Sequence, residues 1–192
     1  MLLVRHQGHA YAEKFFNSAT ASSYGSVVRA ATFGRDAAWK RRIVDIAAPE
    51  GKKVLDLACG TGILSSMVAG RQAAFVAGLD LAFEYLARNS AAAGSAVQGT
   101  AEVLPYRDGA FDAVVSSYLA KYVDVRMVLG ECWRVLRSGG TVVMHDFACP
   151  SGAAMRALWD AHFALLRFLG NFVFKPWKPV FDDLDRVICQ SR

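Results

Sequence analysis

The chain has 192 residues, of which 54% are hydrophobic and 20% are charged, and its formal net charge is +5. This length and composition fit one domain with a full hydrophobic core, and they exclude an intrinsically disordered chain. The mild charge fits solvated helix ends, so no nucleic-acid partner is expected, and no uncharged apolar run is long enough to cross a bilayer. Residues 1–6 lack the pattern of a signal peptide, which predicts a soluble, cytoplasmic protein.

The cysteines are scattered along the chain and include no Cys-x-x-Cys pair: Cys59, Cys132, Cys149 and Cys189. This spacing indicates neither a zinc site nor a disulfide framework, so the cysteines are predicted to be reduced and mostly to serve as packing residues. The histidines His6, His9 and His162 fit no metal-ligand spacing, and no metal ion is assigned.

Residues 10–48 have apolar side chains at helical spacing and predict a helical cap, with breaks at Gly25 and Gly34. Helices ahead of the first strand can close over a ligand site, where their aromatic residues line a substrate cavity. Tyr24 and Trp39 are therefore candidate substrate contacts, with ordinary core packing as the alternative. Residues 49–192 form the predicted ligand-binding core.

A buried strand near residues 54–58 runs into a turn that contains Gly60 and Gly62, and an apolar-periodic helix starts at about Ile63. Glycine lets a ligand approach the main chain, and the free N–H groups of the helix start point at the same place. The pattern predicts a nucleotide-like ligand, with a plain helix-capping turn as the alternative. Ser65 stands where a dinucleotide fingerprint has a third glycine, and Asp56 adds a carboxylate, which favours a cationic ligand such as S-adenosylmethionine.

The second and third predicted strands supply the other ligand contacts. The second, at residues 74–79, ends in Asp80, whose carboxylate can accept hydrogen bonds from both hydroxyls of a ribose, although it also suits the N-cap of a helix over residues 82–93. The third, at residues 96–99, is followed by Thr100 and Ala101, which leave room for an adenine ring.

The fourth strand, at residues 111–117, ends in Ser117, and residues 118–122 follow over the mouth of the site. A helix over residues 125–136 precedes a fifth strand at residues 141–147, which carries His145. Strands that alternate with helices predict a doubly wound, parallel α/β sheet in the order 3-2-1-4-5, with a ligand crevice at the carboxyl ends of the strands.

The segment from residue 151 to residue 174 predicts a helix with a heavy apolar face, and charged residues within it argue against a membrane span. This face suits the core, a homodimer contact, a wall of a greasy substrate pocket, or a surface that rests on a membrane. The sequence leaves these four alternatives open. One further helix is predicted over residues 179–190.

In its motifs the chain resembles the class I S-adenosylmethionine-dependent methyltransferases. The matching stretches occur in the expected order, at residues 55–62, Asp80, 101–106, 111–112 and 134–140. Within this family the sequence is similar to the C-methyltransferases of menaquinone and ubiquinone biosynthesis, through residues 16–17, Tyr24, 33–34, 39–41 and 145–147 with Pro150. The resemblance implies a Rossmann-like fold, S-adenosylmethionine as cofactor, S-adenosylhomocysteine as product, and a quinol or other small aromatic acceptor.

Carried over by position, the resemblance implies a set of cofactor contacts: Asp56, Cys59, Gly60, Thr61, Gly62, Asp80, Leu81, Thr100, Ala101, Glu102 and Ser117. Tyr118, over the mouth of the site, is a further candidate substrate contact. Two departures stand out. Lys121 replaces the arginine of the Gly-Leu-Arg-Asn-Val stretch, and lysine lacks the planar, bidentate fork of arginine. The family's last pair of strands is also missing after the final helix, which predicts a truncated form or a partner on the edge of the fifth strand.

For methylation of a ring carbon, an ionised phenol supplies the electron density. Lys121 is the candidate that stabilises a phenolate, and His145 is the candidate base, with a structural role as its alternative. Two other functions keep the same cofactor residues. One is transfer to another small acceptor, such as a lipid amine or a phenol, and the other is a catalytically silent binding module.

Overall fold

The computed structural model describes residues 7–90 and 95–190. It divides into two compact units, Met1–Asp146 and Phe147–Arg192, and each is described by itself. The boundary expected after residue 48 lies inside the first unit. His6 and part of the helix predicted over residues 82–93 fall outside the described residues.

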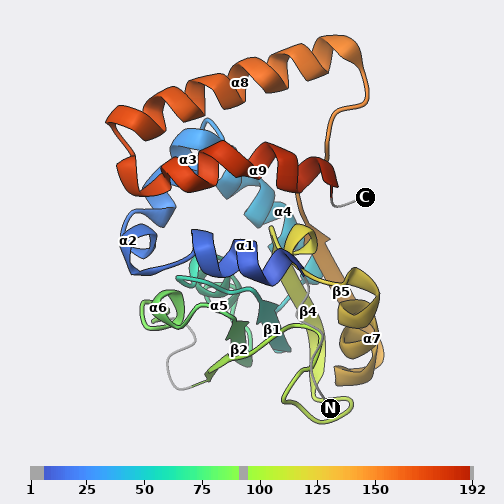
Figure 1. The fold of residues 1–192 in the computed structure, drawn as a ribbon. Coiled ribbons are helices and arrows are strands. Elements are labelled where there is room, and N and C mark those ends of the chain that lie inside the picture. The colour runs from blue at the N-terminus through green and yellow to red at the C-terminus, as the bar shows by residue number, and fades with distance from the viewer. Residues whose placement is uncertain (1–6, 91–94, 191–192) are drawn as a thin grey trace. The chain divides into compact units, whose positions relative to one another are not determined.

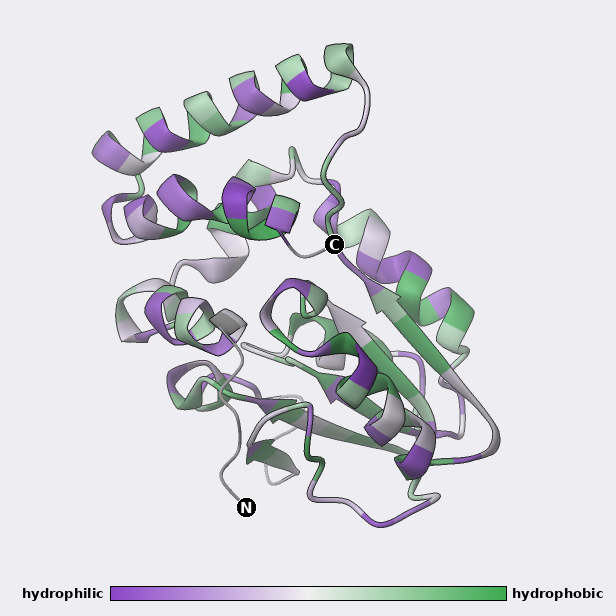
Figure 2. Cartoon of the chain, turned by 45° about the vertical axis from the view of Figure 1, so that its right-hand side comes forward, coloured by the Kyte–Doolittle hydropathy of each residue, from purple (hydrophilic) through white to green (hydrophobic). Residues whose placement is uncertain are grey.

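The first unit contains a five-stranded sheet in the order β3-β2-β1-β4-β5, with every neighbouring pair parallel (Figure 1). This order confirms the predicted doubly wound, Rossmann-like α/β fold. The strands are β1 (Lys53–Leu57), β2 (Phe75–Asp80), β3 (Ala96–Gln98), β4 (Phe111–Ser117) and β5 (Leu136–His145). Figure 2 shows these strands mostly in the hydrophobic colour, as expected of strands covered on both faces. Within the described residues, no strand follows β5.

Short helices surround the sheet of the first unit. They are α1 (Gln7–Phe15), α2 (Ser18–Ala21), α3 (Tyr24–Ala31), α4 (Asp36–Ala47), α5 (Ile63–Ala69), α6 (Phe83–Leu86), η1 (Ala120–Tyr122) and α7 (Val125–Val135). The break predicted at Gly34 is confirmed, whereas the break predicted at Gly25 falls slightly earlier, at residues 22–23, and Gly25 lies inside α3. The chain also turns at Asn17, whose side chain accepts a hydrogen bond from the N–H of Ala19 and forms a capping box with Thr20.

The direction of the chain places helices on both faces of the sheet. It moves from β1 to β2 in one direction and from β4 to β5 in the other, so right-handed crossovers put α5 and α7 on opposite faces. Helix α4 shares the α5 face, because Ile43, Val44 and Ala47 join one apolar cluster with Leu64 and Val68 of α5. Part of the predicted helical cap is therefore core, and only the helices before α4 are left to cover the ligand crevice.

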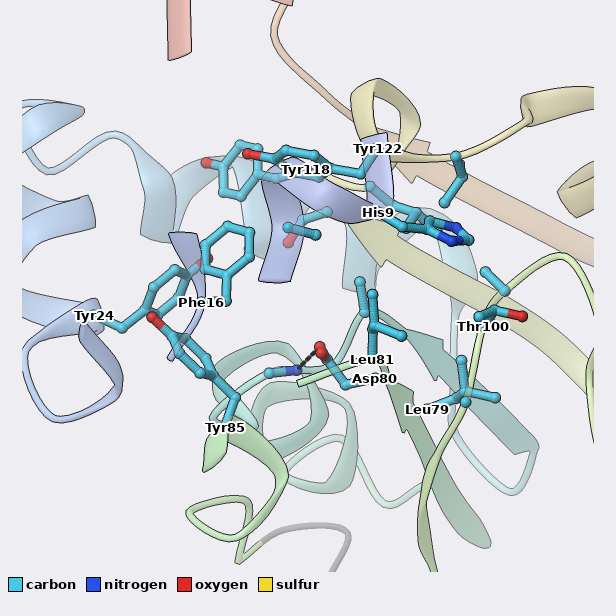
Figure 3. Close-up of a pocket in the computed structure, with 18 residues that line it drawn as sticks. His9, Phe16, Tyr24, Leu79, Asp80, Leu81, Tyr85, Thr100, Tyr118 and Tyr122 are labelled. Carbon is cyan, nitrogen blue, oxygen red and sulfur yellow. Dashed lines mark hydrogen bonds between the residues drawn. The ribbon is translucent and has the colours of Figure 1, made fainter. Parts of the chain in front are cut away.

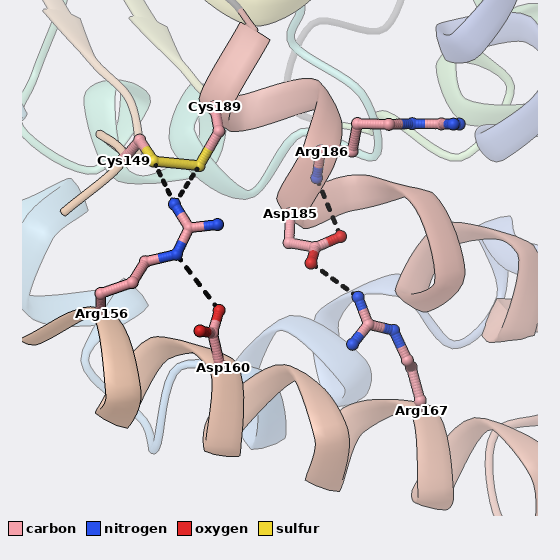
Figure 4. Close-up of a disulfide and its surroundings, with 7 residues drawn as sticks. All are labelled: Cys149, Arg156, Asp160, Arg167, Asp185, Arg186 and Cys189. Carbon is pink, nitrogen blue, oxygen red and sulfur yellow. Dashed lines mark hydrogen bonds and ion pairs between the residues drawn. A yellow bond between two sulfur atoms is a disulfide. The ribbon is translucent and has the colours of Figure 1, made fainter. Parts of the chain in front are cut away.

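The second unit is a pair of helices, α8 (Ala153–Phe172) and α9 (Lys178–Gln190), joined by the short helix η2 (Lys175–Trp177). Arg167 of α8 and Asp185 of α9 form an ion pair of 2.6 Å between Nη2 and Oδ2 (Figure 4). The helix predicted near residues 179–190 is confirmed. No helix of the described residues is long and apolar enough to cross a membrane.

A disulfide between Cys149 and Cys189 closes this unit, with 4.9 Å between the two Cα atoms (Figure 4). The prediction that these two cysteines are reduced is therefore wrong. They lie 40 residues apart in the sequence, and the turn between α8 and α9 brings them together. The Arg156 guanidinium donates to both sulfur atoms, at 3.0 Å and 3.4 Å. Cys59 and Cys132 are free and buried, as predicted.

Candidate active site

A pocket with an empty volume of about 680 Å³, part of it open to solvent, lies at the carboxyl ends of the strands in the first unit (Figure 3). Its walls come from α1, α3 and α6, from the loops after β1, β2 and β3, and from the segment after β4. The doubly wound topology predicts a ligand crevice at this edge of the sheet. Eight of the predicted site residues line it: Tyr24, Gly60, Asp80, Leu81, Thr100, Ala101, Ser117 and Tyr118.

The loop after β1 depends on glycine at two positions. Gly60 has φ +53°, and its N–H donates a 2.8 Å hydrogen bond to Oδ2 of Asp80. Gly62 has φ +84°, and a Cβ atom there would lie 2.1 Å from Oδ1 of Asn89. Any other residue at either position carries backbone strain, and at position 62 it also displaces a buried side chain. The loop is thus held close to the tip of β2.

Asp80 is bound from the main chain at both of its carboxylate oxygens. Oδ1 accepts from the N–H of Ala82 and Oδ2 from the N–H of Gly60, each at 2.8 Å. Burial raises the pKa of Asp80, and these backbone hydrogen bonds oppose the rise. Each oxygen of a carboxylate can accept a second hydrogen bond, so the side chain can receive two vicinal hydroxyls while its position stays fixed.

Asp56 lies beneath the loop and does not line the pocket. It faces α4 and α5, where Ser65 Oγ donates to its Oδ2 at 2.7 Å, and only 1% of the residue is exposed. Oδ1 has no hydrogen-bond partner among the described residues. Burial raises the pKa of Asp56 to about 7, against the opposing Ser65 hydrogen bond. This group adds negative potential under the loop at and above neutral pH.

Five predicted cofactor contacts lie outside the lining: Asp56, Cys59, Thr61, Gly62 and Glu102. The Glu102 carboxylate turns toward α1 instead. Its Oε1 lies 2.9 Å from Nε2 of His9 and accepts a 3.2 Å hydrogen bond from the N–H of Asp124. His9 itself lines the pocket, and the sequence assigned it no role, because nothing in the local pattern of α1 links it to Glu102.

Aromatic rings form one side of the pocket. Phe16 contacts Tyr24, Tyr85 and Tyr122 with ring centroids 6.4, 5.5 and 5.6 Å apart, and Tyr24 lies 5.5 Å from Tyr85. All four contacts are edge-to-face. Only Tyr24 was predicted as a site residue, because the other rings come from separate elements and meet only in the folded chain.

Tyr118 closes the pocket above Ser117 and has φ +70°, a conformation that a bulky residue adopts rarely. Its N–H donates to the carbonyl of His145 at 2.8 Å, and its hydroxyl donates to Oδ1 of Asp36 at 2.8 Å. Asp36 also pairs with Lys40, whose Nζ lies 4.8 Å from the centroid of the Tyr118 ring. Burial and the Asp36 charge raise the pKa of Tyr118 far above its usual value, so its hydroxyl stays protonated.

The two predicted catalytic side chains flank Tyr118 and do not line the pocket. Lys121 is buried, and its Nζ donates to Oδ1 of Asp146 at 2.6 Å and to the carbonyl of Tyr118 at 2.7 Å. Burial lowers the pKa of Lys121, and Asp146 opposes this change. The His145 ring lies 5.5 Å from the Tyr118 ring and 5.2 Å from that of Trp39, and burial lowers its pKa. Trp39 lies outside the lining as well.

The chemistry of the lining fits a cationic nucleoside. Asp80 is its acidic residue, and the described lining contains neither lysine nor arginine. The Asp56 carboxylate, buried under the loop, adds negative potential, and Gly60 borders the pocket without a side chain. In the described part of the chain, no group of acidic, histidine or cysteine residues is arranged to hold a metal ion.

Comparisons with known proteins agree with this geometry. A family model described as a methyltransferase domain matches residues 55–144. The chain is 38% identical over 166 residues to a demethylmenaquinone methyltransferase of Thermus thermophilus, a match that covers 81% of this chain and 76% of the relative. A demethylmenaquinone methyltransferase of Thermotoga maritima is 31% identical over 167 residues, with 83% and 67% covered.

Among solved structures, the YcgJ protein of Bacillus subtilis superposes with a TM-score of 0.54 at 27% identity, over 67% of this chain and 58% of that chain. The chain likewise spans 57% of a demethylmenaquinone methyltransferase of Mycolicibacterium paratuberculosis, at 33% identity. It therefore covers less than two thirds of the length of these two proteins.

Proposed function

The chain belongs to the class I S-adenosylmethionine-dependent methyltransferases, and from this premise we propose that it methylates a ring carbon of a demethylmenaquinol or a related prenylated quinol. The choice of acceptor rests on one observation, the 38% identity to a protein named demethylmenaquinone methyltransferase, over most of both chains. The aromatic lining of the pocket supports this choice, because it suits a flat, apolar ring.

Asp80 would hold the ribose hydroxyls of the cofactor, since both of its oxygens are fixed by backbone N–H groups and can accept again. Thr100, Ala101 and Leu81 would border the adenine, and Gly60 and Ser117 would border the methionine part. The glycine conformations at positions 60 and 62 support close contact with the main chain.

When bound, the cofactor supplies a methyl carbon made electrophilic by a positively charged sulfur. The protein then has to align a nucleophilic ring carbon with that methyl group and keep water away, so positioning carries much of the rate. Tyr118 would form the fixed side of the acceptor site, because its main chain is held by His145 and its hydroxyl by Asp36. Its hydroxyl stays neutral and does not compete as a methyl acceptor.

We assign Lys121 and His145 to the positioning of Tyr118. Lys121 donates to Asp146 and to the Tyr118 carbonyl, the His145 ring contacts the Tyr118 ring, and neither side chain lines the pocket. The proton of the quinol hydroxyl would then leave to solvent or to a base that the bound acceptor brings into reach. Lys121→Met tests this assignment. If Lys121 only positions Tyr118, the variant should raise the acceptor KM and leave the pH dependence of the methylation rate unchanged.

The test is incubation of the purified protein with S-adenosylmethionine and a panel of demethylated quinols, phenols and lipid amines, followed by product mass spectrometry. The proposal expects the mass of one added methyl group on a quinol, at carbon, and no such gain with Asp80→Ala. If only phenols or amines are methylated, the acceptor is another small molecule and not a quinol. Cofactor binding without any methylated product would indicate a silent binding module.

A further inference from the structure

Four rings make up what we call the aromatic wall of the pocket: Phe16, Tyr24, Tyr85 and Tyr122. Phe16 touches the other three, at centroid distances between 5.5 and 6.4 Å. The rings come from the residue after α1, from α3, from α6 and from η1, so the wall forms only when four separate segments fold together. Such a cluster contributes more to the site than hydrophobic area, because an aromatic face carries negative potential.

The charge around the wall strengthens this effect. The carboxylate that lines the pocket is that of Asp80, and no lysine or arginine is among the described lining residues. Burial raises the pKa of Tyr24 and of Tyr85 well above the usual value, so both rings stay neutral and keep their electron-rich faces. The hydroxyl of Tyr85 donates to Oγ1 of Thr20 at 2.9 Å, which fixes the ring. The wall therefore presents a site that attracts a cation.

The position of Asp80 decides which part of the cofactor meets the wall. In Figure 3, Asp80 lies between Thr100 on one side and Phe16, Tyr24 and Tyr85 on the other. Tyr85 also stands next to the glycine loop, because a Cβ at position 60 would be 3.5 Å from its Cδ1. If the ribose binds Asp80 and the adenine extends toward Thr100, the sulfur of the cofactor extends from the other side of the ribose toward the wall.

We propose that the aromatic wall recognises the positive charge of the sulfonium and so distinguishes S-adenosylmethionine from S-adenosylhomocysteine. The inference rests on the proposed function, because it takes this pocket as the cofactor site. Methyl transfer breaks the bond between the methyl carbon and sulfur and leaves the electron pair on sulfur, so the product is a neutral thioether. The attraction of the rings is then lost, which favours release of the product over retention.

Phe16 allows a direct test, because its ring has no hydroxyl and contacts the other three. We would replace it by phenylalanine analogues with one, two and five ring fluorines, which weaken the negative face while nearly preserving the shape. Equilibrium binding by calorimetry should show a stepwise loss of S-adenosylmethionine affinity, about tenfold in total, with S-adenosylhomocysteine affinity changed by less than about twofold. Equal loss for both ligands, or no loss for either, overturns the proposal.

Tyr85 supplies a second, independent pair of variants. Tyr85→Phe keeps the ring and removes the hydrogen bond to Thr20, whereas Tyr85→Leu removes the aromatic face. The ratio of the affinity for S-adenosylmethionine to that for S-adenosylhomocysteine should be unchanged in Tyr85→Phe and should fall several-fold in Tyr85→Leu. A ratio that follows the hydroxyl contradicts the role of the ring. If the unmodified protein binds neither ligand, the cofactor assignment itself fails. If it binds both and fluorination of Phe16 leaves the ratio of the two affinities unchanged, only the role of the aromatic wall is overturned.

Discussion

The two sides of the pocket are built by different means. The cofactor side uses the main chain of the loop after β1, where the N–H of Gly60 donates to Asp80 at the end of β2 and Gly62 packs against Asn89, which follows α6. The opposite side uses side chains from α1, α3, α6 and the segment after β4, where Tyr118 is tied to Asp36. A side built from the main chain tolerates little change, whereas a side built from separate side chains can be altered piece by piece. Substitutions on the first side should therefore affect folding and cofactor binding together. On the second side they should act separately, with the aromatic wall affecting the affinity for S-adenosylmethionine and Tyr118 affecting acceptor binding.

The largest expected effect concerns Asp56, under the cofactor side. Burial raises its pKa from 3.8 to about 7, so the folded protein holds this proton more tightly than the unfolded chain. Its contribution to stability is complete below about pH 4 and is lost as the pH rises through about 7, which lowers the free energy of unfolding by up to ~4 kcal/mol. Urea unfolding between pH 5 and pH 8 should show this slope, and Asp56→Asn should remove it.

Asp45→Asn is the matched control, because Asp45 is exposed and pairs with Arg71 at the surface. It should leave the slope intact. An unchanged slope in Asp56→Asn would show that other groups set the pH dependence.

The next effect tests the fit of the glycine loop. Gly62→Ala combines φ +84° with a Cβ placed 2.1 Å from Asn89 Oδ1, and we expect a loss of roughly 3 kcal/mol in the free energy of unfolding. Gly34→Ala is the control, because its φ is +75° but no atom lies within 4 Å of the added Cβ. It should cost about 1 kcal/mol, the conformational part alone. Equal losses would mean that Asn89 moves aside without cost.

Asp80→Asn should weaken S-adenosylmethionine binding by about 30-fold, or ~2 kcal/mol, because charge-assisted hydrogen bonds to the ribose are lost. The amide keeps one oxygen that can accept from Gly60 or Ala82, so the fold should persist in circular dichroism. Calorimetry measures the affinity, with Asp108→Asn as the control, since Asp108 is exposed and pairs with Arg134. An affinity within twofold of the unmodified protein would place the ribose elsewhere.

The contrast between contacts next to strand ends and side chains from separate segments explains which parts of the fold and the site could be predicted from the sequence. The strand order and the contacts at Gly60, Asp80, Thr100 and Ser117 lie next to strand ends, so a local pattern was enough to place them at the pocket. Lys121 and His145 contact Tyr118, which lines the pocket while they do not, and no local pattern predicts φ +70° at a tyrosine.

Longer-range contacts were missed for the same reason. The aromatic wall combines residues 16, 24, 85 and 122, and the disulfide joins Cys149 to Cys189. Both features bring together residues that are far apart in the sequence, so no local sequence pattern predicts them. The turn at Asn17 differs from these long-range contacts, because its capping box with Thr20 involves residues three apart and is a local signal for the start of a helix.

The smallest expected effect lies on the acceptor side and separates it from the cofactor side. Tyr118→Phe removes the hydrogen bond to Asp36 but keeps the ring and leaves Asp36 paired with Lys40. The ring then loses its tether, worth about 1 kcal/mol, and the acceptor KM should rise about fivefold while the affinity for S-adenosylmethionine stays within twofold. Tyr106→Phe is the control, since its hydroxyl contacts the Gly78 carbonyl at 3.4 Å and its ring lies outside the pocket lining. If Tyr118→Phe weakened the cofactor and left KM unchanged, Tyr118 would belong to the cofactor side, and the two sides would not be separable.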